Sequence, residues 1–178
     1  MDRKDINDIL RQDVDSFPSL TEEGRNRLIR RRKRIFERAP IVDALSQDVL
    51  SDLKQLGYDI EGVDEIGERF HRVMPPNVVD VLIAHINRNM NRCLACDESS
   101  GESSFFHSLV SALASTKSPF NGDFLTKCYD QTHDLQVRFT ILSLISMEIV
   151  TGIESWLSRK ARDPDDPFFC KTLNDLRS

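Results

Sequence analysis

The sequence is poor in cysteine, glycine, proline and aromatic residues. Its 178 residues include four cysteines, seven glycines and seven prolines, and 7% of the side chains are aromatic. So few and so unevenly placed cysteines exclude a disulfide framework in a chain of this size. The scarcity of glycine and proline excludes collagen-like and low-complexity chains. No stretch reaches the roughly 18 apolar residues of a membrane-spanning helix, so the sequence predicts a globular chain with its own hydrophobic core.

The first residues and the thiols bear on where the protein works. The segment Met1–Asp5 is charged and leads into no apolar stretch, unlike a secretory signal. Four cysteines without a disulfide pattern fit a compartment that keeps thiols reduced. We therefore expect a cytoplasmic protein.

Motifs of the common enzyme classes are also missing. The sequence has no glycine-rich phosphate loop, no His-Glu-x-x-His pair and no calcium-binding loop. Phe106-His107-Ser108 places a histidine beside a serine, but without the Gly-x-Ser-x-Gly context and the sheet of a serine hydrolase. The sequence therefore predicts no enzyme, and with it no catalytic residue, metal or cofactor.

Apolar residues recur every three or four positions along the chain, and no stretch alternates with period two. This pattern predicts an all-α protein without strands. Residues 1–40 carry 11 basic and 8 acidic side chains, whereas residues 41–178 carry 13 and 21, which gives the net charge of −5. We interpret residues 1–178 as a single helical domain, with a basic N-terminal helical segment (1–40) and an acidic helical-repeat body (41–178).

Caps and helix breakers predict where several helices begin and end. Thr21, followed by two glutamates, suits a helix N-terminus, and Pro40 predicts that this helix ends just before it. A further helix is expected after Pro40, with Gly57 as its left-handed terminator. The serine-rich residues 97–104 are predicted to be a loop. Residues 134–150 are predicted to be a helix that is apolar on nearly all sides, and therefore central.

Pairs of helices, each pair about 35 to 45 residues long, predict stacked repeats. One stretch is more specific, namely Leu125, then Asp134-Leu135-Gln136-Val137-Arg138, then Leu142. Asp134 can cap the second helix, Val137 can face the first, and Arg138 can bring its guanidinium to an acid or carbonyl of the adjoining repeat. The stretch resembles the HEAT-repeat pattern of an apolar first helix, a turn that ends in Asp, and Val-Arg three residues on.

The resemblance covers residues 121–146 well and the neighbouring segments poorly. Segment 153–176 keeps an acid at Asp166, but Phe169 and Cys170 stand where Val and Arg would be. The resemblance implies a short right-handed superhelix of stacked helical hairpins, an armadillo-like α-solenoid, and such solenoids usually serve as recognition scaffolds. Another type of helical bundle is the alternative fold.

Residues 25–38 contain eight basic side chains in fourteen positions. On a helical wheel the apolar residues gather on one side and the basic residues on the other, so the segment is an amphipathic basic helix. The candidate partner-binding residues are Arg27, Arg30, Arg31, Lys33, Arg34 and Arg38. They could bind nucleic acid, an acidic protein surface or an anionic membrane. The alternative is a solvated face whose charges form ion pairs with the acidic body.

Cys93 and Cys96 have the spacing of half a zinc site or of a redox pair. A complete zinc site needs two more ligands, and Cys128 with His133 or His107 would serve only if the fold brought them together. No second Cys-x-x-Cys exists, so buried cysteines at a helix end are the favoured interpretation.

Three other polar residues fall on apolar helix faces. His85 lies in the apolar arc of its helix, which favours a hydrogen-bonded core histidine over a ligand or a base. Glu148 is expected at a helix edge or paired with a base such as Arg138 or Arg32. Arg32 projects into an apolar stripe, so its head group should pair with a carboxylate or reach the edge of the interface.

These observations favour a non-enzymatic, cytoplasmic helical-repeat protein that binds a protein partner, as an adaptor or in a neutralising, immunity-type role. The alternative is a nucleic-acid-binding helical-repeat protein that uses the basic helix 25–38. A metal or thiol enzyme at Cys93 and Cys96 is the third hypothesis.

Overall fold

Helices make up nearly all of the structure. The computed structural model describes residues 21–70, 74–94, 100–116, 119–147 and 149–177. The helices are α2 (Glu22–Gln55), α3 (Glu65–Arg69), α4 (Pro76–Leu94), α5 (Gly101–Ala112), the 3-10 turn η1 (Leu113–Ser115), α6 (Asp123–Gln131), α7 (Leu135–Ser146), α8 (Glu154–Lys160) and α9 (Pro167–Arg177). The all-α prediction is confirmed.

Two strands of two residues each are the exception. β1 (Phe120–Asn121) and β2 (Val150–Thr151) pair in parallel. The prediction that strands are absent is therefore wrong at this point, and α7 ends at Ser146, four residues earlier than predicted. Gly122 permits the close approach, because its N–H donates to the carbonyl of Thr151 (2.9 Å) and a side chain on it would overlap the opposite strand.

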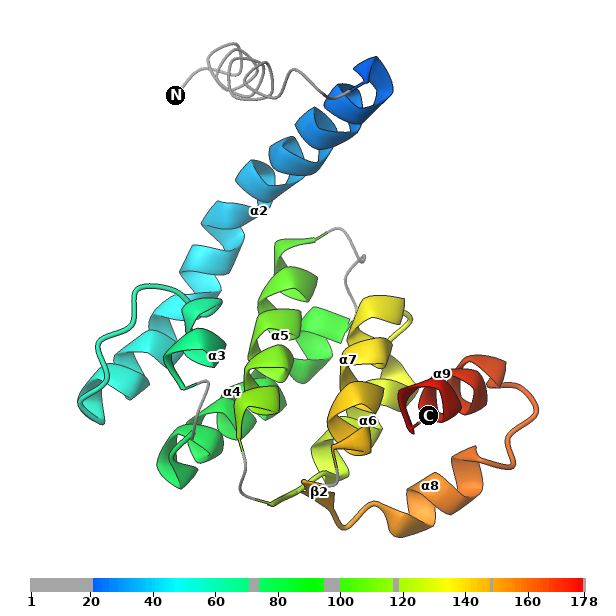
Figure 1. Cartoon of the computed structure of the whole chain (residues 1–178). Coiled ribbons are helices and arrows are strands. Elements are labelled where there is room, and N and C mark those ends of the chain that lie inside the picture. The colour runs from blue at the N-terminus through cyan, green and yellow to red at the C-terminus, as the bar shows by residue number, and fades with distance from the viewer. Residues whose placement is uncertain (1–20, 71–73, 95–99, 117–118, 148, 178) are drawn as a thin grey trace.

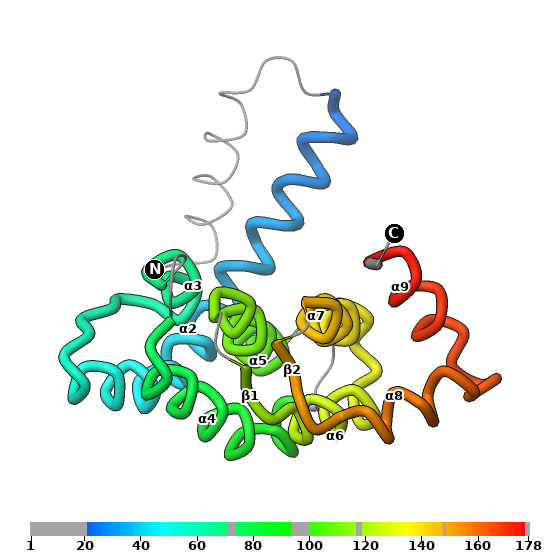
Figure 2. The backbone as a smooth tube through the Cα atoms, turned by 60° about the horizontal axis from the view of Figure 1, so that its bottom comes forward, coloured from blue at the N-terminus to red at the C-terminus, as the bar shows by residue number. Residues whose placement is uncertain are grey.

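Helices α4 to α9 form two layers. Figure 2 shows α5, α7 and α9 in one row and α4, α6 and α8 in the other. The packing agrees, because α4 contacts α5 and α6, α5 contacts α7, and α7 contacts α6 and α9. Successive helices thus alternate between the layers. Fully buried side chains come from both layers, including Leu82, Ile86, Phe105, Leu109 and Tyr129.

His85 of α4 belongs to this core. Its side chain is 1% exposed, and Nε2 lies 2.8 Å from Oδ2 of Asp52 in α2. The prediction of a hydrogen-bonded core histidine is confirmed. The contact ties α4 to the C-terminal half of α2.

Helix α2 is continuous over 34 residues. Thr21 caps it by accepting a hydrogen bond from the N–H of Gly24 (3.2 Å), and Gly57 adopts a φ of 89° just after it ends. Both terminal signals are therefore confirmed. The predicted end before Pro40 is wrong, because Pro40 lies inside the helix.

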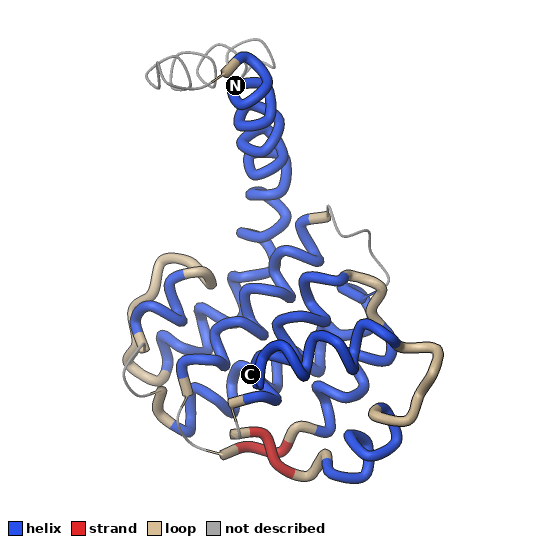
Figure 3. Tube along the Cα trace, turned by 45° about the vertical axis from the view of Figure 1, so that its right-hand side comes forward, coloured by secondary structure: helices blue, strands red, loops and turns tan. Residues whose placement is uncertain are grey.

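Tertiary packing explains why Pro40 does not end α2. Proline lacks an N–H and costs about 3 kcal/mol in a helix interior. The part of α2 that follows Pro40 packs on α4 and α5, and its buried residues Ser46, Val49 and Leu53 all lie there. The part that precedes Pro40 extends beyond the two layers (Figures 1 and 3). The fold therefore fixes one half of a helix and presents the other half to solvent.

Helix α2 and the body approach each other closely at Gly101, the first residue of α5. A Cβ built on Gly101 would lie 2.6 Å from Cβ of Ile41 and 3.1 Å from the carbonyl oxygen of Arg38. The Arg38 side chain also donates from Nη1 to Oγ of Ser104 (3.1 Å). Since α5 begins at Gly101, residues 101–104 are helical, and the predicted loop over 97–104 is wrong there; residues 97–99 lie outside the described residues.

We predict that Gly101→Val lowers the free energy of unfolding by about 1–3 kcal/mol, the usual cost of overpacking, in urea denaturation. Gly67→Ala in α3 is the control, because its new Cβ would meet Oγ of Ser115 and Cα of Ala112 at the ordinary distances of 3.5 and 3.7 Å. This control should be neutral or gain up to about 1 kcal/mol, since Ala favours helix. If Gly101→Val is as stable as the parent protein, α2 and α5 are not packed as closely at Gly101 as the structure shows.

Candidate functional site

A groove lies between the N-terminal half of α2 and the start of α7. Its volume of about 1060 Å³ is at the upper limit of the about 300–1,000 Å³ of small-molecule pockets. Most of its lining residues are basic or apolar, and they are Gly24, Arg27, Leu28, Arg31, Arg34, Ile35, Arg38, Asp134, Leu135 and Gln136. The basic helix and the repeat turn, which the sequence marks separately, therefore face the same groove.

Helical periodicity puts four of the candidate arginines on the groove side of α2. Arg27, Arg31, Arg34 and Arg38 follow one another at intervals of four, three and four residues, so they share one helix face. At about 1.5 Å per residue they extend over about 16 Å. Arg27, Arg31 and Arg34 are exposed, and Arg38 is half-buried.

None of the three exposed arginines, Arg27, Arg31 and Arg34, forms an ion pair with another described residue. Ion pairs among the described residues include those of Lys54, Arg92, Arg159 and Lys160. The alternative in which the basic face is neutralised by the acidic body therefore finds no support among these three residues.

The other two candidates on α2 lie apart from the groove. Arg30 lines a smaller hollow of about 460 Å³, together with Glu22, Glu23, Asn26 and Ile29. Lys33 is exposed and is not part of either lining. Four of the six candidates therefore line the groove and two lie outside it. Replacing two basic residues in the groove, or the two outside it, changes the net charge by the same amount, so one variant can serve as the control for the other.

Arg38 marks the inner end of the groove. Its Nη1 donates to Ser104, but its Nε is buried and has no hydrogen-bond acceptor among the described residues. An unpaired buried donor is unfavourable by about 1–3 kcal/mol. The groove therefore ends at a guanidinium whose hydrogen-bonding capacity is only partly used.

Asp134 also lines the groove, and both of its carboxylate oxygens accept hydrogen bonds from the protein. Its side chain is 8% exposed, and Oδ1 accepts from the N–H groups of Gln136 (2.8 Å) and Val137 (3.2 Å). Its Oδ2 accepts from Oγ of Ser103 in α5 (2.6 Å). The predicted cap is confirmed, and the carboxylate that would repel an anion is engaged inside the protein.

Val137 and Arg138 stabilise the turn that precedes α7. Val137 is 1% exposed. Arg138 donates from Nε to the carbonyl of Thr132 (2.8 Å), and its guanidinium lies 4.9 Å from the ring centroid of Tyr129. The carbonyl partner is of the predicted kind, but it belongs to the turn before α7 itself and not to an adjoining repeat.

Apolar side chains remain exposed beside the arginines. Ile35 is 57% and Phe36 47% exposed on α2, while Leu135 is 54% and Phe139 49% exposed on α7. The expectation that α7 is enclosed on nearly all sides is therefore wrong for the face that carries Leu135 and Phe139. Ile35 and Leu135 both line the groove, so its walls are apolar as well as cationic.

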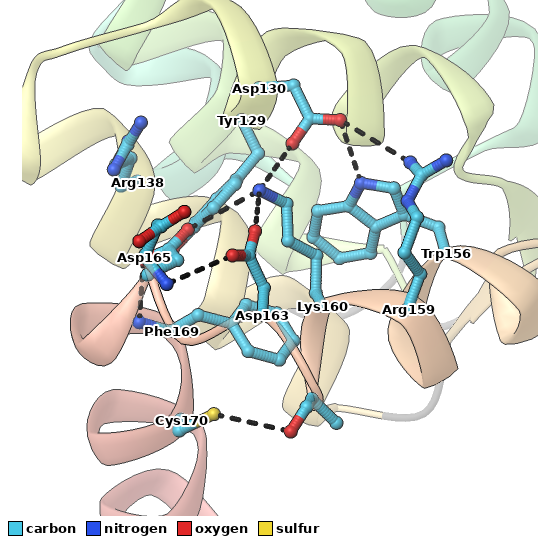
Figure 4. A network of polar contacts seen from close by, with 12 residues as sticks. Tyr129, Asp130, Arg138, Trp156, Arg159, Lys160, Asp163, Asp165, Phe169 and Cys170 are labelled. Atoms are coloured by element: carbon cyan, nitrogen blue, oxygen red, sulfur yellow. Dashed lines mark hydrogen bonds and ion pairs between the residues drawn. The ribbon is translucent and has the colours of Figure 1, made fainter.

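A second polar cluster, which no pattern in the sequence indicates, lies between α6, α8 and the start of α9 (Figure 4). Nζ of Lys160 lies 3.0 Å from Asp130, 3.4 Å from Asp163 and 3.6 Å from Asp166, measured to the carboxylate oxygens. Burial lowers the pKa of Lys160, but its hydrogen bond to Asp130 and the neighbouring carboxylates outweigh this and raise the pKa overall. The lysine thus stays charged and acts as the counterion of the cluster.

Aromatic packing accompanies this cluster. Tyr129, Trp156 and Phe169 meet edge to face at centroid distances of 5.4 to 5.9 Å. The hydroxyl of Tyr129 donates to Oδ1 of Asp166 (3.3 Å), and burial, followed by the charge of Asp166, raises the pKa of Tyr129. These polar and aromatic contacts join α6, α8 and α9.

The thiols do not assemble into a site among the described residues. Cys96 lies outside the described residues, and Cys93 is buried. Burial raises the pKa of the fully buried Cys128 thiol to about 12, which disfavours the thiolate that metal binding needs. His133 is exposed, whereas His107 contacts Oγ1 of Thr140 (3.0 Å). No group of three metal-ligating side chains occurs in the described part of the chain.

Three other expectations concern Glu148, Arg32 and membrane-spanning helices. Glu148 lies outside the described residues, so its predicted pairing stays a prediction. Arg32 is half-buried on α2. Of the helices in the described ranges, none combines the length and the apolar character that crossing a bilayer requires.

Comparison of the chain with protein-family models, with curated proteins and with solved structures returns no match.

We predict that Tyr129 does not ionise in the folded protein near pH 10, the ordinary pKa of tyrosine. Tyr58→Phe leaves Tyr129 as the single tyrosine, since the chain has two. The near-ultraviolet phenolate absorbance should then stay flat through about pH 10 when folded and rise there in urea. Because the folded pKa is raised, the stability contributed by Tyr129 is fully present below about pH 10 and is lost above it. A phenolate signal near pH 10 in the folded variant would contradict this environment.

Proposed function

We propose that this chain is a cytoplasmic, non-enzymatic helical-repeat protein of HEAT-like type that binds a protein partner in the groove between α2 and α7. Four arginines on one helix face carry this proposal, because the groove holds cationic and apolar groups that no described carboxylate neutralises. An adaptor and a neutralising protein would both use such a surface.

Support for the repeat comes from the caps of the three helices in one layer. Ser100, Asp134 and Asp166 each accept a hydrogen bond from the N–H three residues on, at 3.0, 3.2 and 3.1 Å, before α5, α7 and α9. The caps are 34 and 32 residues apart. The residue three positions after each cap, Ser103, Val137 or Phe169, is buried. The same turn chemistry at a nearly constant interval is what a stacked repeat requires.

The alternation of layers is the second support. Each unit adds one helix to each layer and contacts the previous unit through the same layer, as in α4 with α6 and α5 with α7. The interval between caps is shorter than the about 40 to 47 residues of HEAT and armadillo repeats and near the about 34 of other helical-hairpin repeats. The likeness to HEAT repeats therefore lies in the residues of the α6–α7 turn, whereas the repeat unit is shorter than a HEAT repeat.

Support for protein binding comes from the mixed character of the groove. Partner sites in proteins combine apolar anchors with arginine and exclude water around them. Leu28, Ile35 and Leu135 supply the apolar part, and their neighbours on α2 supply the guanidinium groups. A purely electrostatic site would not need exposed apolar walls.

We predict that a photo-crosslinking amino acid at Leu135 captures a protein partner in cells. The capture should be lost in the double variant Arg31→Glu, Arg34→Glu, which reverses two groove charges. The double variant Arg30→Glu, Lys33→Glu makes the same change in net charge on the outer side of the helix and should retain the product. Loss of the product in both variants, or in neither, would contradict a partner site in the groove.

Nucleic-acid binding is the second candidate, because eight basic residues in fourteen positions also suit a phosphate backbone. Filter binding of duplex DNA across a salt series separates the two functions. Binding through about four phosphates would make log K fall with log[salt] at a slope of about −4. Our proposal expects only weak DNA binding at physiological salt, with no difference between the groove and outer variants.

A further inference from the structure

The groove arginines are spaced as the side chains of a second helix would be. Arg27 to Arg38 covers about 16 Å in three intervals, which is about 5.5 Å for each, and the pitch of an α-helix is about 5.4 Å. A partner helix that lies along α2 and carries an acid on each turn of one face would therefore meet each guanidinium in register. This inference rests on the proposed function and names the partner's chemistry.

Other occupants do not keep this register. Same-face residues of an extended strand are about 6.7 Å apart, so three intervals cover about 20 Å. Phosphates along one strand of duplex DNA recur about every 3.4 Å, so three intervals cover about 10 Å. Of the three spacings, the helical one matches the four groove arginines over their whole length.

The apolar walls supply the second requirement on the partner. Leu28 and Ile35 are seven residues apart, next to Arg27 and Arg34, and Leu135 of α7 also lines the groove. Ile35 and Leu135 are more than half exposed, so their apolar surface is available for burial by apolar side chains. A helix that pairs through carboxylates must therefore also carry apolar residues beside them, as helices bound in grooves do.

We propose that the groove between α2 and α7 binds an acidic amphipathic helix of a protein partner. Its carboxylates, spaced three and four residues apart, face Arg27, Arg31, Arg34 and Arg38, and its apolar side chains cover Ile35 and Leu135. The exposed arginines form no ion pair with a described residue that binding would have to break. The Asp134 carboxylate already accepts hydrogen bonds from Ser103 and from backbone N–H groups. The partner's acids therefore displace no ion pair between these exposed arginines and a described residue.

The test uses the full chain and two fluorescein-labelled model helices, followed by fluorescence anisotropy. In the first peptide, glutamates stand four, three and four residues apart on one face with leucines beside them. The second has the same composition with the glutamates distributed around the helix. The first should bind at least about tenfold more tightly, which is about 1.4 kcal/mol. Equal affinity of the two peptides would overturn the inference.

Two pairs of variants test the register and the apolar walls. Arg31→Glu with Arg34→Glu should weaken binding of the first peptide by about a hundredfold or more, whereas Arg30→Glu with Lys33→Glu should change it by less than about tenfold. Ile35→Ser with Leu135→Ser should weaken it by about tenfold. Both wall positions are exposed, so these changes should preserve the helical circular dichroism. An unchanged affinity of the wall variant, or full displacement of the peptide by duplex DNA at equal charge, would overturn the amphipathic helix.

The two proposals fail in different ways. If the Leu135 crosslink forms with the expected dependence on Arg31 and Arg34 but the peptides bind equally, the partner site stands and its occupant is not an acidic helix. If the crosslink does not form, the partner site itself is wrong.

Discussion

The contact between Gly101 of α5 and the middle of α2 is the constraint on which the rest of the structure depends. A glycine there lets α5 approach to within van der Waals contact of Ile41 and the Arg38 carbonyl. That approach fixes α2 on both sides of Pro40, so the helix continues where a free peptide would break. With its C-terminal half held by α4 and α5, α2 presents its N-terminal half beside α7. The groove is a consequence of this one crossing.

The repeat supplies the other wall of the groove. Both carboxylate oxygens of Asp134 accept hydrogen bonds, from the first N–H groups of α7 and from Ser103, which ties the turn to α5. Leu135 and Gln136 follow directly and form the wall opposite the arginines. At the far end of the body, Lys160 and its three aspartates join α6, α8 and α9. We therefore regard Asp130, Asp134, Asp163 and Asp166 as internal ties rather than as partners of the basic helix.

Local signals in the sequence predict local structure well here, and contacts between distant helices explain what they miss. Thr21, Gly57 and Asp134 act as predicted, because caps and terminators depend on neighbours within a few residues. Pro40 fails as a helix stop because packing from α5, some 60 positions along the chain, outweighs its local cost. The cluster around Lys160 could not be predicted, because Asp130 comes from α6, some 30 positions before the lysine, whereas Asp163 and Asp166 come from the segment between α8 and α9. The same limit applies to the groove: periodicity identifies a basic face but not which arginines lie opposite α7.

We conclude that α2 is one rigid helix across Pro40. Only a continuous helix keeps its arginines in register beside α7. Pulsed electron paramagnetic resonance measures this directly, with nitroxides on unnatural ketone amino acids at the exposed positions Asn26 and Gln47. Twenty-one residues of continuous helix predict a narrow distance distribution centred near about 32 Å. A broad distribution, or a centre well below that value, would mean that the helix bends or breaks at Pro40 and would contradict the account.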